Sequence, residues 1–188
     1  MTVRVNTEDK TLLIKQILTF NNTSNDTLDH IILNDWNNAF YSKSSALAKK
    51  YSDEYVRAFH LATKKERGFT EIKTIVDNGF QTVNWNRPNT KVDLVKLKLN
   101  QPILPCSKQT FTLVYTVKIP DSKFTKYGYY NDGRIVLKNW YLNPARFEHK
   151  QFIQYSNENL DDIPNAFSDF EIEFELPKDY ALSSNLQE

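Results

Sequence analysis

The chain of 188 residues has little cysteine and little glycine, and each shortage excludes a class of protein. Cys106 is the only cysteine, so an internal disulfide and a zinc site built from paired cysteines are both excluded. An unpaired cysteine is usually a buried, inert thiol, and this is the state expected of Cys106. The four glycines form no glycine-rich phosphate loop, which excludes the backbone cradle that binds nucleotides.

An excess of charge of one sign and long apolar runs are also missing. The 24 basic and 23 acidic residues give a net charge of +1 and are interspersed along the chain. A nucleic acid is therefore not expected as a partner, because its binding proteins carry a basic stripe. No apolar run approaches the roughly 18 residues of a membrane-spanning helix, and the first ten residues lack the apolar core of a signal peptide.

Metal-binding and catalytic patterns are lacking as well. The three histidines, His30, His60 and His149, lie far apart and belong to no His-Glu-x-x-His motif. Residues 157–162 place oxygen-bearing side chains at alternate positions, but the sixth residue is not glycine and the twelfth is not glutamate. This segment is interpreted as a solvated loop. We expect no catalytic residue, metal ligand or cofactor within the chain itself.

Three asparagines, Asn21, Asn22 and Asn25, fit the acceptor pattern for glycosylation. They cluster between two long strand candidates, where asparagine is a common turn residue. Turn formation is therefore the preferred interpretation of this polar corner.

Strand signals dominate what is present. Aromatic residues reach 13%, which favours sheets because flat rings pack well on a pleated surface. Residues 110–119 and 170–176 alternate between apolar and polar side chains, the pattern of an antiparallel sheet with one wet face. Shorter strand candidates cover residues 12–20, 27–33, 69–76, 82–85, 92–99, 134–142 and 151–155.

Turns and one helical segment complete the predicted fold. Asn78-Gly79 predicts a type I′ hairpin turn, and Asn131-Asp132-Gly133 predicts another. Residues 44–65 have apolar residues at helical spacing, with a possible second start at Ser52 and a helix end near Gly68. The sequence therefore predicts one mainly β domain over residues 1–188, an antiparallel β-sandwich or saddle with a helical insertion near residues 44–65.

The three tryptophans are candidates for ligand contact. Trp36, Trp85 and Trp140 lie near the ends of strand candidates, where an indole can stack on a sugar ring or close a core. Core packing is favoured because a buried indole removes a large apolar area from water. Carbohydrate binding is the main alternative that the residues themselves suggest.

Four segments carry a resemblance to a known family. They are residues 17–28 (ILTFNNTSNDTL), 32–40 (ILNDWNNAF), 113–120 (LVYTVKIP), and 172–177 with 181–185 (IEFELP and ALSSN). These segments resemble the N-terminal domain of the aminopeptidase N and leukotriene-hydrolase (gluzincin) family of zinc metallopeptidases, in the version familiar from Bacteroidetes-like bacteria. The resemblance runs nearly from end to end.

The resemblance implies a saddle-shaped β domain that covers one side of a thermolysin-like catalytic domain. In that family the zinc ligands and the general base lie in the catalytic domain, so this chain would be a fragment without chemistry of its own. The implied partners are its own catalytic domain and the peptide substrate of the parent enzyme. The resemblance also suggests an exported or membrane-associated parent.

The family's N-terminal domain contributes a Gln-x-Glu or Gln-x-Gln stretch that holds the free amine of the substrate. By position this stretch corresponds to Asn139, Trp140 and Tyr141, which are the expected substrate-binding residues. Tyr141 replaces the acid and offers only a neutral oxygen, whereas a carboxylate paired with an ammonium group makes the strong anchor. The leading hypothesis is thus a non-catalytic, substrate-framing domain, and the alternative is a free-standing carbohydrate- or protein-binding module.

Overall fold

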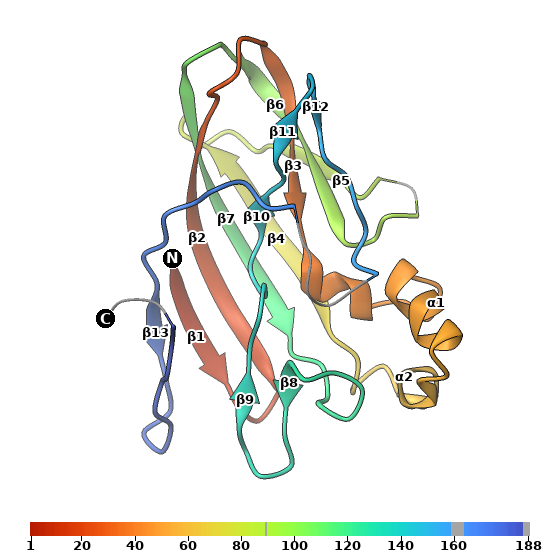
Figure 1. The fold of residues 1–188 in the computed structure, drawn as a ribbon. Helices are drawn as coiled ribbons and strands as arrows, with labels where there is room; N and C mark the ends of the chain where they lie inside the picture. The colour runs from red at the N-terminus through yellow and green to blue at the C-terminus, as the bar shows by residue number, and fades with distance from the viewer. Residues whose placement is uncertain (89, 159–163, 186–188) are drawn as a thin grey trace.

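Two sheets form the body of the protein in a computed structural model that describes residues 1–88, 90–158 and 164–185 (Figure 1). The larger sheet has five strands in the order β13-β1-β2-β7-β4. Their bounds are β13 Glu173–Glu175, β1 Thr2–Asn6, β2 Thr11–Asn21, β7 Lys108–Lys118 and β4 Phe69–Asp77. The pairs β1–β2, β2–β7 and β4–β7 are antiparallel, and β13 runs parallel to β1.

The second sheet is antiparallel and has the order β10-β3-β6-β5. Its strands are β10 Asn143–Pro144, β3 Leu28–Asn34, β6 Leu94–Ile103 and β5 Asn84–Asn86. Two small hairpins are formed by β8 Gly128–Tyr129 with β9 Ile135–Val136, and by β11 Phe147–Glu148 with β12 Gln151–Phe152. The mainly β, antiparallel sandwich predicted from the sequence is confirmed.

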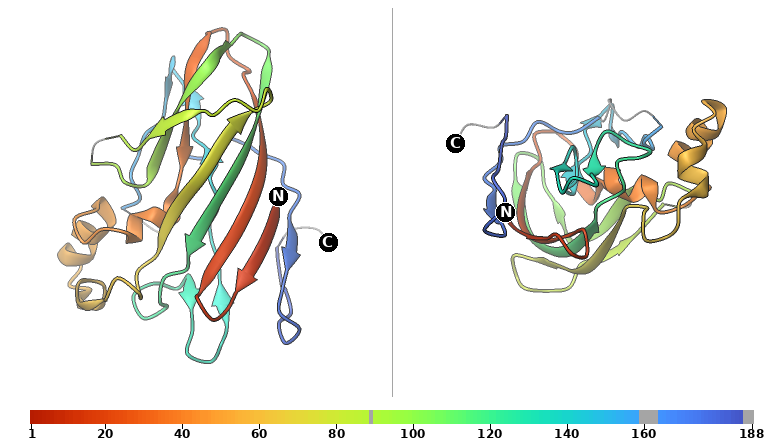
Figure 2. Two further views of the ribbon diagram at one scale, coloured as in Figure 1. Left: turned by 180° about the vertical axis from the view of Figure 1, so that it is seen from behind. Right: turned by 90° about the horizontal axis from the view of Figure 1, so that it is seen from below.

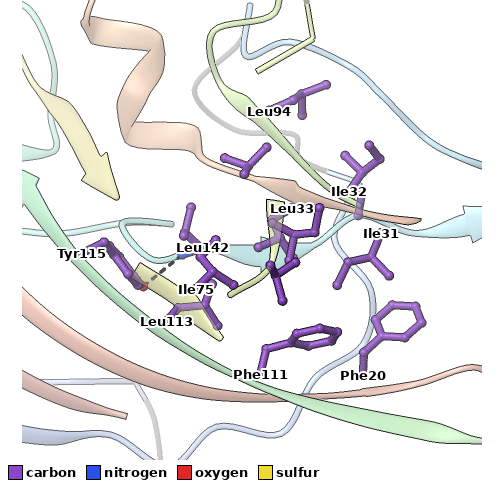
Figure 3. Packing of buried hydrophobic residues seen from close by; sticks show 14 of the residues in the cluster. Phe20, Ile31, Ile32, Leu33, Ile75, Leu94, Phe111, Leu113, Tyr115 and Leu142 are labelled. Carbon is purple, nitrogen blue, oxygen red and sulfur yellow. Dashed lines mark hydrogen bonds between the residues drawn. The ribbon is translucent and has the colours of Figure 1, made fainter. Parts of the chain in front are cut away.

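The core lies between the two sheets (Figures 1 and 3). Phe111 and Leu113 of β7 lie in the same buried cluster as Ile31 and Leu33 of β3, and none of the four is exposed. The alternation in residues 110–119 predicts these inward positions, because successive side chains of a strand point to opposite faces. β2 and β7 pair in register over eleven residues, which makes this pair the longest part of the sheet.

A helical insertion joins β3 to β4, as predicted, but it is broken into short pieces. It consists of the 3-10 helix η1 (Trp36–Phe40) and the helices α1 (Ala46–Asp53) and α2 (Arg57–Leu61). Ser52 lies inside α1 and does not start a second helix. The insertion has its own buried cluster, which includes Phe40 and Phe59. Among the described residues, no helix is long and apolar enough to cross a membrane.

Gly68 does not end a helix, contrary to the prediction, because α2 stops at Leu61. A β-carbon added at Gly68 would lie 3.0 Å from Cδ of Pro120 and 3.1 Å from the carbonyl oxygen of Lys118. The glycine is therefore explained by a close approach of two backbone segments.

Three predicted strands are largely absent. Residues 134–142 contribute only β9, residues 151–155 only β12, and residues 170–176 only β13, which pairs in parallel rather than antiparallel. Alternation alone does not reveal whether a neighbouring strand offers a partner for the backbone. The segment after β9 instead finds its partners among core side chains, as described below.

Both predicted turns form, but neither is type I′. In the turn at residues 131–133 only Gly133 has a positive φ, +89°, and the Tyr130 amide donates a 2.8 Å hydrogen bond to the Arg134 carbonyl. At the β4–β5 turn the left-handed residue is Phe80, at φ +60°, so the type I′ prediction for Asn78-Gly79 is wrong. The Asp77 carboxylate accepts hydrogen bonds from the amides of residues 79 and 81 and so sets a longer turn.

The prediction that Cys106 is buried is wrong, since the side chain is exposed. Cys106 lies in the β6–β7 turn at φ +55°. A 3.2 Å hydrogen bond from the Ser107 amide to the Leu104 carbonyl closes this turn. Of the apolar residues 102–105 before Cys106, the first two end β6, and β7 begins only at Lys108.

Glu66 attaches the end of the helical insertion to Lys123, and its lowered pKa allows this attachment to be tested. Its carboxylate is bound by the Lys123 ammonium, and also by the Thr63 amide at 2.7 Å and the Thr63 hydroxyl at 2.8 Å, which lower its pKa from 4.5 to about 2. A carboxyl group with a lowered folded-state pKa stabilises the fold above its unfolded pKa and loses this contribution as the pH falls.

We expect Glu66→Gln to flatten the dependence of the free energy of unfolding on pH between about 4.5 and about 2. Urea unfolding at several pH values measures this slope. Glu71→Gln, at an exposed position of β4, is the matched control and should leave the slope unchanged. Identical slopes for the native chain and the Glu66 variant would contradict the assignment.

Candidate functional site

Three hydrogen bonds inside the core position the segment that contains the predicted site. The Tyr115 hydroxyl accepts from the Leu142 amide at 3.2 Å (Figure 3). The same hydroxyl donates to Oε1 of Gln16 at 2.6 Å. Nε2 of Gln16 donates to the Leu142 carbonyl at 2.8 Å. Tyr115 and Gln16 are 1% and 3% exposed. Side chains of β7 and β2 therefore replace the strand partner that Leu142 lacks.

The site residues themselves form a bend rather than a strand. Asn139 has φ +48°, a left-handed conformation that is uncommon for residues other than glycine. Trp140 turns into the core, where its ring lies 5.8 Å from that of Phe174. Tyr141 is half-buried, its ring lies 4.9 Å from that of Phe170, and desolvation raises its pKa. Tyr141 also packs against the core, and its ring lies 5.2 Å from that of Trp140.

β3 and β10 bring a second predicted segment to the same place. Asn34, the last residue of β3, is the register partner of Asn143 at the start of β10. The amide nitrogen Nδ2 of Asn34 donates to Oδ1 of Asn165 at 2.8 Å. Oδ1 of Asn34 is buried and has no hydrogen-bond partner within the described part of the chain.

A buried ion pair fixes the turn from β3 into η1. Oδ2 of Asp35 lies 2.6 Å from Nη2 of Arg87, with the two side chains 3% and 20% exposed. Oδ1 of Asp35 accepts from the Thr70 hydroxyl at 2.6 Å, and the Asp35 amide donates to the Asp93 carbonyl at 2.8 Å. Buried charge is tolerated here because both carboxylate oxygens are bonded. The next residue, Trp36, is thereby held in place.

The asparagines after Trp36 have structural roles. Nδ2 of Asn37 donates to the carbonyls of Phe69 and Lys118, each at 3.0 Å. Nδ2 of Asn38 donates to the Val92 carbonyl at 2.6 Å. Both side chains are buried and bond η1 to strand backbone, so they are occupied and not free to hold a ligand.

Trp36 lies where residues 32–40 approach residues 139–143. Its ring lies edge-on to Phe40 at 6.0 Å and to Tyr127 at 6.1 Å, and the residue is 4% exposed. Its Nε1 is buried and has no hydrogen-bond partner among the described residues. A narrow hollow, too tight to hold a water molecule, is lined by Asn34, Trp36, Asn139, Tyr141, Asn143 and Asn165.

The chemistry of this hollow is neutral. Its six lining side chains are four carboxamides, an indole and a phenol, so none carries a charge at neutral pH. The unpartnered Nε1–H of Trp36 is a donor, and the unpartnered Oδ1 of Asn34 is an acceptor. The hollow therefore offers no carboxylate to an ammonium ion.

The described residues contain no cluster of three or more His, Cys, Asp or Glu that could hold a metal ion. The three histidines lie in separate parts of the fold. Nδ1 of His30 lies 2.5 Å from Oδ1 of Asp29, and Nε2 of His60 lies 3.0 Å from the Ala48 carbonyl. His149 lies in the β11–β12 turn at φ +50°.

The tryptophans divide into two groups. Trp36 and Trp140 are buried, so neither offers a free face to a sugar ring. Trp85 on β5 is 39% exposed. The carbohydrate-binding alternative therefore depends on one side chain at the edge of the smaller sheet.

Two further segments from the sequence have structural explanations or fall outside the description. Asn22 is buried, and its Nδ2 donates to the carbonyls of Asp26 at 2.8 Å and Leu104 at 3.0 Å, which supports the turn interpretation.

Of residues 157–162, whose spacing partly resembles a calcium loop, residues 159–162 lie outside the described residues. The Asn157 amide donates to the carboxylate of Asp93, whose pKa is raised by burial.

Sequence reasoning missed four residues that position the hollow: Gln16, Tyr115, Asp35 and Arg87. Gln16 does carry a signal, because it occupies an inward position in the alternation of β2. A polar side chain at such a position requires a buried partner. The partner of Asp35 lies 52 residues away, and no local pattern indicates it.

Comparisons with known proteins give only a weak structural likeness. No family model matches the chain, and no curated protein matches it. Among solved structures it is similar to an M1 zinc metallopeptidase from Deinococcus radiodurans, at 17% identity and a TM-score of 0.37. It is also similar to a two-domain M1 zinc metallopeptidase bound to L-tryptophan, at 15% identity and a TM-score of 0.38.

Each of these matches covers 63% of this chain, but only 18% of the first structure and 19% of the second. The chain thus spans less than a fifth of the length of either protein. TM-scores below 0.5 are too low to place it in their family.

Removing the Tyr115 hydroxyl tests the positioning of the site segment. Tyr115→Phe leaves Oε1 of Gln16 and the Leu142 amide without this partner, and should lower the free energy of unfolding by about 1–3 kcal/mol. Urea unfolding measures the loss, and hydrogen exchange at the Leu142 amide should accelerate. Tyr130→Phe, which loses an exposed hydrogen bond to the Lys126 carbonyl, is the control. Equal losses in the two variants would refute the special role of Tyr115.

The ion pair beneath Trp36 gives a second test. Asp35→Ala leaves the Arg87 guanidinium largely buried without its carboxylate, and should lower the free energy of unfolding by about 3–5 kcal/mol. Asp53→Ala, at an exposed position of α1, should change it by less than about 0.5 kcal/mol. Chemical denaturation followed by tryptophan fluorescence reports both, and a loss below about 1 kcal/mol for the Asp35 variant would contradict the prediction.

Proposed function

We propose that this chain is a non-catalytic, substrate-framing domain of a zinc metallopeptidase, related to the N-terminal domain of the aminopeptidase N family. Its function would be positional, since a wall beside a cleft excludes water and orients the end of a peptide. Its partners would be its own catalytic domain and the peptide substrate of the parent enzyme. Residues 1–188 would act as one domain of that longer protein.

One observation carries the proposal. Residues 32–40 and 139–141 are separated by about a hundred positions, and the resemblance selects both of them independently. In the fold, Asn34 and Trp36 from the first segment line the same hollow as Asn139 and Tyr141 from the second. A chance likeness in sequence gives no reason for these two segments to meet at buried polar atoms that lack partners.

The hollow also supports a particular kind of substrate contact. In the family, a carboxylate at this place binds the free amine, whereas Tyr141 provides a phenol whose pKa is raised by burial and which stays neutral. A peptide group that opened the tight hollow would meet the neutral donor of Trp36 and the neutral acceptor of Asn34. We therefore propose that the parent enzyme does not anchor a free peptide amine through this domain.

Zinc would be held by the catalytic domain and not by this chain. The described residues contain no cluster that could ligate it. The first experiment is to read the gene beyond the codon for Glu188, and to measure zinc content and aminopeptidase activity of the chain alone. A continuing frame that encodes His-Glu-x-x-His, with no stoichiometric zinc and no cleavage by the chain alone, would support the proposal.

A stop codon at that point would overturn the proposal. A glycan panel would then test the binding-module alternative through Trp85, the one exposed tryptophan of the three. Saturable binding that is lost in Trp85→Ala would favour the module.

A substitution in the whole protein tests the neutral hollow. Tyr141→Glu supplies the missing carboxylate, and should raise kcat/KM for a free-amine aminoacyl reporter about tenfold relative to its N-acetylated form, because charge-assisted hydrogen bonds are strong. Tyr155→Glu, at a side chain that is 70% exposed, is the control and should leave the ratio unchanged. A native enzyme that already prefers the free amine by a large factor would contradict the neutral role of the hollow.

A further inference from the structure

The chain as a whole is nearly neutral, but one of its segments is basic. Residues 43–67, which contain α1 and α2, carry seven basic and three acidic side chains, a net charge of +4. The other residues carry seventeen basic and twenty acidic side chains, a net charge of −3. Six of the basic side chains are exposed: Lys43, Lys49, Lys50, Arg57, Lys64 and Lys65.

Little of this charge is neutralised within the segment. Glu54 lies 3.1 Å from Lys50, and Glu66 is bound to Lys123 from outside the segment. Of the three acids, only Asp53 is left to face the remaining exposed cations. The insertion therefore presents an excess of positive charge to the solvent, and that charge attracts an anionic surface within a Debye length.

The insertion is also placed to meet another body. It buries Leu47, Tyr51 and Phe59 in the cluster around Phe40, and its lysine side chains are exposed to solvent. In Figure 2 both helices project from the side of the molecule opposite the two termini. Nothing else in the described chain covers them.

Three large apolar side chains near these cations in the sequence are also exposed. Tyr55 is 85% exposed, Leu61 is 80% exposed and Tyr41 is 50% exposed. Tyr55 lies between α1 and α2, and Leu61 is the last residue of α2. Large apolar side chains exposed beside basic ones are typical of segments that lie on a membrane surface.

The backbone at Tyr55 has a left-handed conformation that usually requires glycine. The Tyr55 amide donates to the Ser52 carbonyl at 3.0 Å, and the Val56 amide donates to the Tyr51 carbonyl at 2.7 Å. These two bonds form the Schellman motif that ends a helix, with Tyr55 at the position usually taken by glycine. Tyr55 has φ +59°, which is strained for a bulky side chain. The ring gains no burial in return, so the fold alone does not explain a tyrosine here.

We propose that the outer surface of residues 41–65 binds an anionic lipid bilayer. Five of the six exposed cations are lysines, which are depleted in protein interfaces but suit attraction to a charged lipid surface. Leu61 has no flat ring to stack on a base, whereas it can enter the acyl boundary. Tyr55 and Tyr41 have the amphipathic rings that lie at the headgroup level. The proposal is independent of the peptidase role and holds for either function discussed above.

Co-sedimentation of the full 188-residue chain with lipid vesicles tests the proposal. We expect binding to vesicles of phosphatidylcholine with about one-third phosphatidylserine, and none to phosphatidylcholine alone. The double variant Lys49→Glu and Lys64→Glu should weaken binding by at least about tenfold. The matched control, Lys108→Glu with Lys178→Glu, makes the same change in net charge at exposed positions outside the insertion and should bind as the native chain does.

Tyr55→Gly separates binding from folding. Glycine relieves the left-handed strain, so the thermal midpoint should stay equal or rise while vesicle binding falls several-fold. A fall in binding with an unchanged or higher midpoint supports a direct contact of the ring.

Three outcomes would overturn the proposal. The native chain fails to bind the anionic vesicles, or both double variants lose binding equally, which shows only a general charge effect. In the third, the chain binds polyglutamate as a soluble acidic partner but not the vesicles, and the surface is then a protein-docking site.

Discussion

The hydroxyl of Tyr115 is the contact on which the arrangement of the candidate site depends. It lies between the sheets, is fully bonded, and joins Gln16 of β2 to the backbone of Leu142. Without these bonds the Leu142 amide would be buried and unpaired, a state that proteins avoid. Because Leu142 is fixed, β10 begins at the next residue and brings Asn143 beside Asn34. One phenol thus couples the larger sheet to the edge of the smaller one.

The charged side chains of Asp35 and Arg87 do not line the hollow, whose residues are all neutral. The Asp35 carboxylate is fully bonded by Arg87 and Thr70, and this network stabilises the turn that carries Trp36. The hollow beside it contains only neutral polar groups. Nε1 of Trp36 and Oδ1 of Asn34 have no hydrogen-bond partner among the described residues, so the Asp35 network and not these two atoms stabilises this region.

Sequence patterns predicted the long elements well and the site poorly. Strict alternation located β7, because a strand with one wet face must alternate. The same pattern failed over residues 134–142, where side chains of other strands bind the backbone and Asn139 adopts a left-handed conformation. Helical spacing located the insertion but not its break, since tyrosine at position 55 gives no glycine signal. Residues 139–141 are candidates through the resemblance alone, whereas their closeness to Trp36 follows from the pairing of β3 with β10, which no local pattern contains.

The pairing of β1 with β13 has a consequence for how the chain is made. The Glu173 amide donates to the Met1 carbonyl at 2.8 Å, so β1 forms its outer ladder with a segment that is synthesised much later. On the ribosome, the free edge of β1 must wait until about 170 further residues have emerged. An exposed strand edge is a template for pairing with other chains. The nascent protein therefore passes through a long interval in which its N-terminal strand is open to aggregation or to capture by a chaperone.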